Sequence, residues 1–227
     1  MIRAVLFDFD GLILDTETAE FQSWQETYQE FDLELDIEVY AQCIGRGASD
    51  QEFKPIDHLQ ELLGHRLDIN AVAAKRKKRN LDLIDAQTAL PGVTDYITTA
   101  KQLGLRVGLA SSSPRSWVST YLNHLELLDR FDTIRTADDV VRAKPYPELY
   151  LRALADLQVS ADEAIALEDS PNGVAAAVAA GIYTVWVPNS VTRMLPCYGY
   201  DLRLDSLADL SLADLIEGVA EPMAIAL

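Results

Sequence analysis

Cysteine is scarce in this chain, whose 227 residues include only Cys43 and Cys197. Two cysteines are too few for a disulfide scaffold, so we expect both to remain reduced thiols. No apolar run is long enough to cross a membrane, and the N-terminus lacks the pattern of a signal peptide. From these absences we expect a soluble, cytoplasmic protein that has no membrane partner.

Positively charged residues are also few, since the chain has 19 Lys and Arg residues and 36 Asp and Glu residues. The formal net charge of −17 disfavours nonspecific binding to nucleic acid, so we expect no nucleic-acid partner. The chain also lacks a Gly-x-Gly-x-x-Gly motif after its first expected strand, and it has no Gly-Lys-Ser/Thr motif. Nicotinamide and P-loop nucleotide chemistry are therefore unsupported.

The first expected strand and the acids that follow it organise the rest of the chain. The apolar run Ala4-Val5-Leu6-Phe7 predicts a buried strand, and Asp8 and Asp10 follow it two residues apart. Two acids packed together are costly unless a cation or a proton lies between them. A solvated turn would explain Asp10 and its glycine, but it does not explain Asp8 inside the apolar run. The pattern predicts a metal site or a carboxylate nucleophile.

Helices and strands alternate only in the later part of the chain. The segment from about residue 17 to 87 contains no convincing strand, and its periodicity predicts helices over 17–31, 37–43, 50–63 and 69–86. After residue 90, strands are expected at 105–110, 133–136, 164–167, 182–187 and 202–204. Helices are expected at 94–103, 147–157, 173–180 and 211–217. One more helix is expected after the second strand, with Ser113 as its N-cap. This alternation predicts a parallel sheet covered by helices on both faces. We expect an α/β core of residues 1–14 and 89–227 and an inserted helical cap of residues 15–88.

Polar residues stand where the expected strands end. Ser111 to Ser113 follow the second strand, Glu168 and Asp169 follow a later one, and Lys144 lies between them in the chain. In a parallel sheet the carboxyl ends of the strands share one edge, so these residues should gather there. Carboxylates suit Mg²⁺, hydroxyls at a helix start suit phosphate oxygens, and lysine supplies a positive charge. Each motif alone could be a helix cap or a solvated loop, but together they indicate a phosphoryl-transfer site.

Four stretches of the chain resemble the motifs of the haloacid dehalogenase superfamily, in the branch that contains β-phosphoglucomutase and small sugar-phosphate phosphatases. They are residues 8–17, 110–113, 143–148 and 167–173. The resemblance covers nearly the whole chain, including the position of the helical insertion. It implies a Rossmann-like core with a C1-type cap, and a Mg²⁺-dependent phosphatase that acts on a small phosphomonoester through an aspartyl-phosphate intermediate. We also expect a monomer.

The resemblance implies a role for each motif residue. Asp8 would be the nucleophile and Asp10 the general acid and base, while Lys144 would offset negative charge. The implied metal ligands are Asp8, the backbone carbonyl of Asp10, Glu168 and Asp169. The implied phosphate- and substrate-binding residues are Ser111, Ser112 and Lys144 in the core, and Glu20, Arg46 and Lys77 in the cap. The cap would move about hinges near residues 14–16 and 87–92.

Two other functions are compatible with the same core. A sugar phosphomutase of the β-phosphoglucomutase type would pass the phosphoryl group to a sugar hydroxyl instead of water. In this chain Glu20 stands where the mutase has a cap histidine, and the loop around Arg46 lacks the mutase's arginine in the matching place. A non-catalytic phosphate-binding protein would have lost catalytic residues, whereas here every catalytic position holds the required residue type. We therefore favour the phosphatase.

Overall fold

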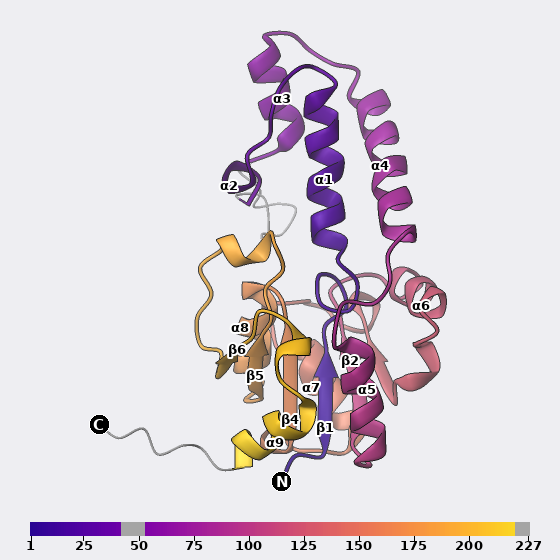
Figure 1. The fold of residues 1–227 in the computed structure, drawn as a ribbon, viewed down its shortest axis with the longest axis vertical. Coiled ribbons are helices and arrows are strands. Elements are labelled where there is room, and N and C mark those ends of the chain that lie inside the picture. Colours follow the sequence, from indigo (N-terminus) through magenta and orange to yellow (C-terminus); the bar gives the residue numbers. More distant parts are fainter. Residues whose placement is uncertain (42–52, 221–227) are drawn as a thin grey trace, which may run out of the picture.

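Six strands within the described residues form one parallel sheet, with β1 near its centre (Figure 1). The computed structural model describes residues 1–41 and 53–220. The strands are β1 (Ala4–Phe7), β2 (Arg106–Ala110), β3 (Thr133–Arg135), β4 (Ala164–Glu168), β5 (Tyr183–Trp186) and β6 (Leu202–Arg203). Their order across the sheet is β3-β2-β1-β4-β5-β6. Phe7 at the end of β1 pairs with Leu109 and Leu167, so three strands end close together.

Helices cover both faces of the sheet, which confirms the predicted fold class. The helices are α1 (Thr16–Gln29), α2 (Ile37–Tyr40), α3 (Pro55–Leu63), α4 (Ile69–Asp85), α5 (Val93–Gln102), α6 (Arg115–His124), α7 (Glu148–Leu157), α8 (Pro171–Ala179) and α9 (Leu212–Ala220). Side chains alternate along a strand, so Val5 and Phe7 point to one face of the sheet, and Ala4 and Leu6 point to the other. The first pair packs in a core with α5, α6 and α9, and the second packs in a core with α7 and α8.

Two predicted helix starts are wrong. The helix expected from residue 50 begins at Pro55, and residues 42–52 lie outside the described part of the chain. The helix after β2 begins at Arg115, and Pro114 rather than Ser113 occupies its N-cap position. Ser113 does not cap this helix because its hydroxyl donates a hydrogen bond to Asp10 instead.

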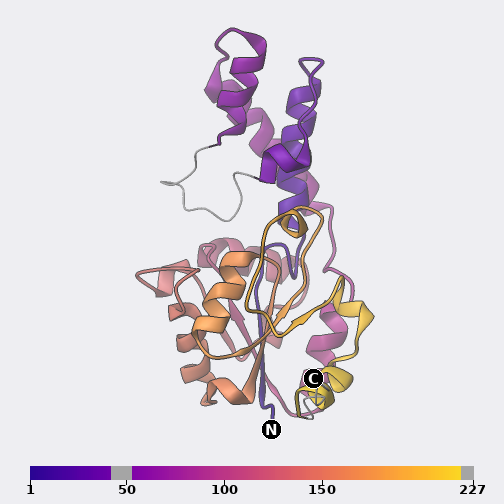
Figure 2. The ribbon, with the colours of Figure 1, turned by 90° about the vertical axis from the view of Figure 1, so that its left-hand side faces the viewer.

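Helices α1 to α4 lie together beyond the carboxyl end of the sheet (Figures 1 and 2). Helices α1, α2 and α3 share a small apolar core that includes Phe21, Tyr28 and Leu59, and Val191 from the loop after β5 is also buried in it. Where the chain leaves α4, the Gln87 side chain donates a hydrogen bond to the Asp15 carbonyl at 3.1 Å. The division of the chain at residues 14/15 and 88/89 stays a prediction, because these contacts show packing and not independent folding.

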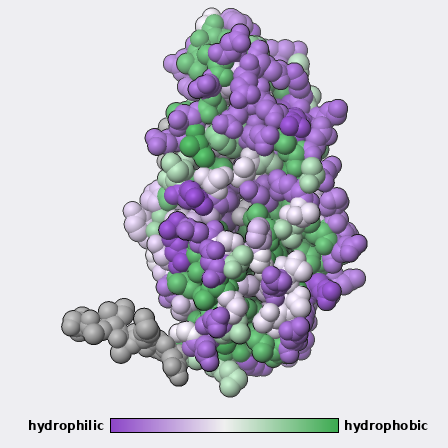
Figure 3. Space-filling model, viewed as in Figure 1, coloured by the Kyte–Doolittle hydropathy of each residue, from purple (hydrophilic) through white to green (hydrophobic). Residues whose placement is uncertain are grey.

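Charged side chains dominate much of the outer surface of α1 and α4, where Figure 3 shows a hydrophilic face. Lys75 pairs with Glu30, and Arg79 pairs with Glu26, each at 2.6 Å. The basic run at residues 75–79 is therefore mostly a solvated face, as its spacing around the helix predicts. Within the residues that the structure describes, no helix is long and apolar enough to span a bilayer.

Ile97 offers a direct test of the core that supports β1. Its side chain is 1% exposed on the inner face of α5. We expect Ile97→Ala to lower the free energy of unfolding by about 2–5 kcal/mol, because the substitution leaves a cavity. Thr98→Ala, at an exposed position of the same helix, should change it by less than about 0.5 kcal/mol. Urea denaturation of both variants measures this, and equal effects would contradict the packing described.

Candidate active site

The ends of the strands and the cap helices enclose a cavity of about 490 Å³. Its core side is lined by Asp8, Asp10, Ser111, Ser112, Ser113, Trp117, Lys144, Asp169, Ser170 and Asn172. Its cap side is lined by Thr16, Glu17, Glu20, Asn80 and Ile84. The volume lies in the range of small-molecule sites. The motifs that are far apart in the sequence are therefore brought to one cavity, at the edge of the sheet where they were expected.

A buried amine lies between two carboxylates at the floor of this cavity. Lys144 is only 5% exposed, and its Nζ lies 2.5 Å from Asp8 Oδ1 and 2.6 Å from Glu168 Oε1. Tyr150 donates its hydroxyl proton to the same Glu168 oxygen. Burial alone would lower the pKa of Lys144, but Asp8 and Glu168 together hold it above its ordinary value. The amine is therefore held in its charged form beside Asp8.

Asp8, Glu168 and Asp169 form a cluster of buried carboxylates that fits a metal ion. One oxygen from each residue lies within 4.8 Å of the others. Burial raises the pKa of Glu168 to about 7 although Lys144 lies beside it, and burial with the charge of Asp8 raises the pKa of Asp169 well above its ordinary value. Glu168 Oε2 is buried without a hydrogen-bond partner among the described residues. Burial and neighbouring negative charge disfavour the ionised forms of these carboxylates. A divalent cation such as Mg²⁺, which prefers oxygen ligands, would stabilise them.

Two glycines make room for the carboxylates of this cluster. Gly11 has a φ of +79°, and a Cβ there would overlap the Asp169 carboxylate. A Cβ at Gly173, in the first turn of α8, would overlap the Glu168 carboxylate. Sequence reasoning assigned no role to either glycine. The only signal was their position, since each lies within five residues after an acid of its motif.

Asp10 is held by two donors from the segment that follows β2. Trp117 Nε1 donates to Asp10 Oδ1 at 2.9 Å, and the Ser113 hydroxyl donates to Oδ2 at 2.5 Å. Burial raises the pKa of Asp10, although the bond from Ser113 opposes this shift. Sequence reasoning missed Trp117, because its indole reaches Asp10 only once α6 is packed against the sheet.

Ser111 and Ser112 both line the cavity, as expected of phosphate-binding residues. Ser111 is buried, and its hydroxyl accepts a hydrogen bond from the Ser113 backbone N–H at 3.0 Å. Ser112 is exposed to the cavity and the solvent. Both serines therefore line the same cavity as Asp8, and their role in phosphate binding stays a prediction.

The cap residues predicted from the sequence differ in whether they line the cavity. Glu20 lines the cavity, where its carboxylate accepts hydrogen bonds from Arg76 and Asn80, both at 2.5 Å. Lys77 is exposed and does not line the cavity, since Arg76 is the member of the basic run that points inward. Arg46 lies outside the described residues. Of the two that the structure describes, Glu20 is at the site and Lys77 is not.

Glu17 is a cavity residue that sequence reasoning did not single out. It lies in the first turn of α1, one residue after the start of the helix. Burial, followed by the charges of Asp10 and Glu20, raises the pKa of Glu17 to about 8. Its place in the first motif was the available signal, but the motif alone does not show which way the side chain points.

The chain belongs to the haloacid dehalogenase-like hydrolase family, whose model matches residues 5–187. It is 46% identical over 217 residues to the presumed phosphatase YhcW of Bacillus subtilis (strain 168), with 96% of this chain and 97% of YhcW covered. It is 30% identical over 233 residues to hexitol phosphatase B of Escherichia coli (strain K12), with 95% and 97% covered. Both matches therefore extend over nearly the whole length of each chain.

A solved structure shows the same fold. The crystal structure of CbbY from Rhodobacter sphaeroides in complex with phosphate matches with a TM-score of 0.71 at 30% identity, covering 95% of this chain and 100% of CbbY. The expected superfamily and fold class are confirmed by these findings together with the family model.

Gly173 tests whether the Glu168 carboxylate needs the space that a glycine provides. We expect Gly173→Ala to lower the free energy of unfolding by about 1–3 kcal/mol, because the added methyl group overlaps that carboxylate. The matched control is Gly218→Ala in α9, where no atom lies within 4 Å of the added Cβ. Since alanine favours a helix, Gly218→Ala should be neutral or stabilising by up to about 1 kcal/mol. Thermal or urea unfolding compares them, and two stabilised variants would contradict the close contact.

Proposed function

We propose that this protein is a Mg²⁺-dependent phosphatase that hydrolyses a small phosphomonoester, such as a sugar phosphate, through an aspartyl-phosphate on Asp8. The observation that carries the proposal is the buried contact of 2.5 Å between Lys144 Nζ and Asp8 Oδ1 at the floor of the cavity. This contact orients one Asp8 oxygen and leaves the second oxygen for attack on phosphorus. The named activities of the phosphatase relatives support the same reaction class.

Asp8 and Asp10 would divide the chemistry between them. In the first step Asp8 forms a bond to phosphorus, the bond to the substrate oxygen breaks, and Asp10 gives that oxygen a proton. In the second step Asp10 takes a proton from water, the water oxygen bonds to phosphorus, and the Asp8–phosphorus bond breaks. The two donors on Asp10, Trp117 and Ser113, support this proposal because they fix its carboxyl group at the cavity wall. The two steps together release inorganic phosphate and regenerate free Asp8.

The proposed cofactor site consists of Asp8, Asp169, the Asp10 carbonyl and Glu168. A bound Mg²⁺ would supply positive charge that stabilises the oxygens of the transferring phosphoryl group. Lys144 would offset negative charge on Asp8 and on the transferring group, and Ser111 and Ser112, which line the same cavity, would hydrogen-bond the phosphate oxygens. Helices α1 to α4 would act as the cap that excludes water from these groups.

Hydrolysis is preferred to the mutase reaction because Glu20 stands where the mutase has a histidine. In the mutase alternative, a cap residue at this position takes part in coupling closure to proton transfer. Here both oxygens of Glu20 accept hydrogen bonds, from Arg76 and Asn80. A purely phosphate-binding role is disfavoured because Asp8, Asp10 and Lys144 are all present and brought together.

Replacing the proposed nucleophile should abolish turnover. We expect Asp8→Asn to lower phosphate release from a panel of sugar and nucleotide monophosphates by at least about a thousandfold with Mg²⁺ present. Asp82→Asn, at an exposed position of α4, is the matched control and should keep wild-type activity. Turnover by Asp8→Asn at the wild-type rate would rule out the covalent mechanism. In the same assay, glucose 6-phosphate formed from β-glucose 1-phosphate without free phosphate would show the mutase instead.

The metal site can be tested by stability. Mg²⁺ at about 100 times its Kd should stabilise the folded state by about 2.7 kcal/mol, which corresponds to a rise in Tm of about 5–10 °C for a chain of this length. Asp169→Asn should remove most of this rise, whereas Asp82→Asn should keep it. Differential scanning calorimetry with and without EDTA measures both, and an unchanged shift in Asp169→Asn would place the metal elsewhere.

A further inference from the structure

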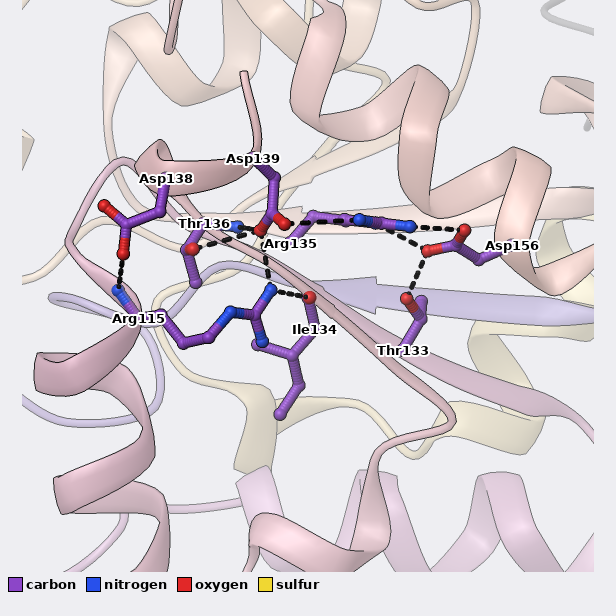
Figure 4. A network of polar contacts seen from close by, with 8 residues as sticks. All are labelled: Arg115, Thr133, Ile134, Arg135, Thr136, Asp138, Asp139 and Asp156. Atoms are coloured by element: carbon purple, nitrogen blue, oxygen red, sulfur yellow. Dashed lines mark hydrogen bonds and ion pairs between the residues drawn. The ribbon is translucent and has the colours of Figure 1, made fainter.

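A network of polar side chains outside the cavity joins the segment after β2 to strand β3 and the segment that follows it (Figure 4). Its members are Arg115, Thr133, Ile134, Arg135, Thr136, Asp138, Asp139 and Asp156. The segment after β2 carries Ser111 and Ser112, the proposed phosphate-binding residues. The segment after β3 runs on to Lys144, which contacts Asp8. The network therefore connects the two segments that bring serine hydroxyls and an amine to the same cavity.

Asp139, whose side chain is 16% exposed, lies at the centre of this network and accepts hydrogen bonds on both carboxylate oxygens. Its Oδ2 accepts from Arg115 Nη2 at 2.7 Å, from the Thr136 backbone N–H at 2.8 Å and from the Thr136 hydroxyl at 3.0 Å. Its Oδ1 accepts from Arg135 Nη1 at 3.2 Å. Burial alone would raise the pKa of Asp139, but the bonds from Thr136 and the Arg115 guanidinium hold it below its ordinary value. The carboxylate therefore stays ionised near neutral pH.

The backbone of the segment after β2 is held by the same neighbours. The Ser111 N–H donates to the carbonyl of the last residue of β3 at 2.9 Å, and the Ser113 carbonyl accepts from the Ala137 N–H at 3.1 Å. The Arg115 N–H donates to Asp138 Oδ2 at 2.9 Å. Alternate residues from 111 to 115 are therefore bonded to β3 or to the turn after it. The position of the serines in the cavity depends on where that turn lies.

Asp139 also fixes the start of the segment that leads to Lys144. Residues Ala137–Asp139 form a turn of 3-10 helix, and the Asp139 carboxylate closes this turn through its bonds with Thr136. Lys144 follows a few residues later, and its amine contacts Asp8. One carboxylate thus holds both the segment of the serines and the start of the segment of the amine.

Asp156 provides a natural comparison, because it binds the same arginine from the other side (Figure 4). Its two oxygens accept hydrogen bonds from Arg135 Nη2 and Nε, both at 2.6 Å, and the Thr133 hydroxyl donates to Oδ2 at 2.5 Å. Asp156 lies in α7, so these bonds fasten the edge strand β3 to that helix. They go to β3 rather than to the segment after β2. The two acids therefore share a partner but differ in what they hold.

We infer that Asp139 is a positioning residue, which holds residues 111–113 and the segment of Lys144 at the spacing that a phosphoryl group requires. Arg115 is the link by which Asp139 holds the serines. This inference rests on the proposed phosphatase function, because that function gives these residues a phosphoryl group to bind. A misplacement of about 1 Å can slow an enzymatic reaction by about a hundredfold, so a bond outside the cavity can matter for catalysis.

Asp139→Asn and Asp156→Asn make the same chemical change on the two sides of Arg135. Each acid accepts on both oxygens, whereas asparagine keeps one acceptor and gains a donor that would face an arginine. In Asp139→Asn we expect the Ki of inorganic phosphate with Mg²⁺ to rise at least about fivefold, and kcat/KM for the best ester to fall at least about tenfold. Asp156→Asn should leave both within about twofold of wild type, even where its Tm falls as far. Equal changes in the two variants, or an unchanged Ki in Asp139→Asn, would overturn the inference.

A double-mutant cycle tests the link through Arg115, and its single variant serves if Asp139→Asn does not fold. Arg115→Met removes the guanidinium from a side chain that is 44% exposed. By itself it should raise the Ki of inorganic phosphate at least about threefold, and Asp139→Asn added to it should have a smaller fold effect than in the wild type. An unchanged Ki in Arg115→Met, or fold effects that simply multiply, would overturn the link.

Direct binding of inorganic phosphate separates this inference from the proposed function. If no ester of the panel were hydrolysed, the phosphatase function would fail. Calorimetric titration with phosphate and Mg²⁺ would then still give Kd values for the wild type and the two asparagine variants. A Kd weakened in Asp139→Asn and not in Asp156→Asn would support the positioning role. Equal Kd values, or no phosphate binding by the wild type, would overturn it.

Discussion

The site depends on one buried interaction, the contact of Lys144 with Asp8 and Glu168. A charged amine inside a protein is unfavourable unless carboxylates surround it, and two carboxylates side by side are unfavourable unless a cation separates them. The Lys144 amine and the two carboxylates therefore stabilise one another in their charged forms. Strands β1 and β4 bring the two acids to the same edge of the sheet, and the loop before α7 brings the amine. The parallel sheet therefore holds the two acids near each other, and the loop places the amine between them.

The core motifs were predictable from sequence because strand order places their residues. Asp8, Ser111 and Asp169 each follow a strand, and parallel strands must end at one edge whatever the details of packing. The family resemblance then supplied roles for these positions. Ser113 was assigned wrongly as a helix cap because its hydroxyl bonds instead to Asp10, which is distant in the sequence and comes close only in the folded chain.

The cap residues could not be predicted in the same way. Residues on a helix that are one position apart point about 100° from each other, so the choice between Arg76 and Lys77 depends on how α4 is rotated against α1. In the structure this rotation brings Arg76 to Glu20 and the Trp24 ring and leaves Lys77 exposed. Asn80 and Trp117 were missed for the same reason, since each acts through a partner on another element.

The loop after β5 joins two parts of the molecule that the chain otherwise links only at the ends of the helical insertion. Val191 of this loop is buried in the apolar core of the cap helices, while Asn189, two residues earlier, donates a hydrogen bond to Asp169 at 2.8 Å. The Val191 backbone N–H in turn bonds to the Asn189 side chain at 3.0 Å. Any displacement of the cap that moved Val191 would therefore pull on a carboxylate of the acidic cluster. The position of the cap helices and the geometry of the acidic cluster are therefore coupled through residues 189–191.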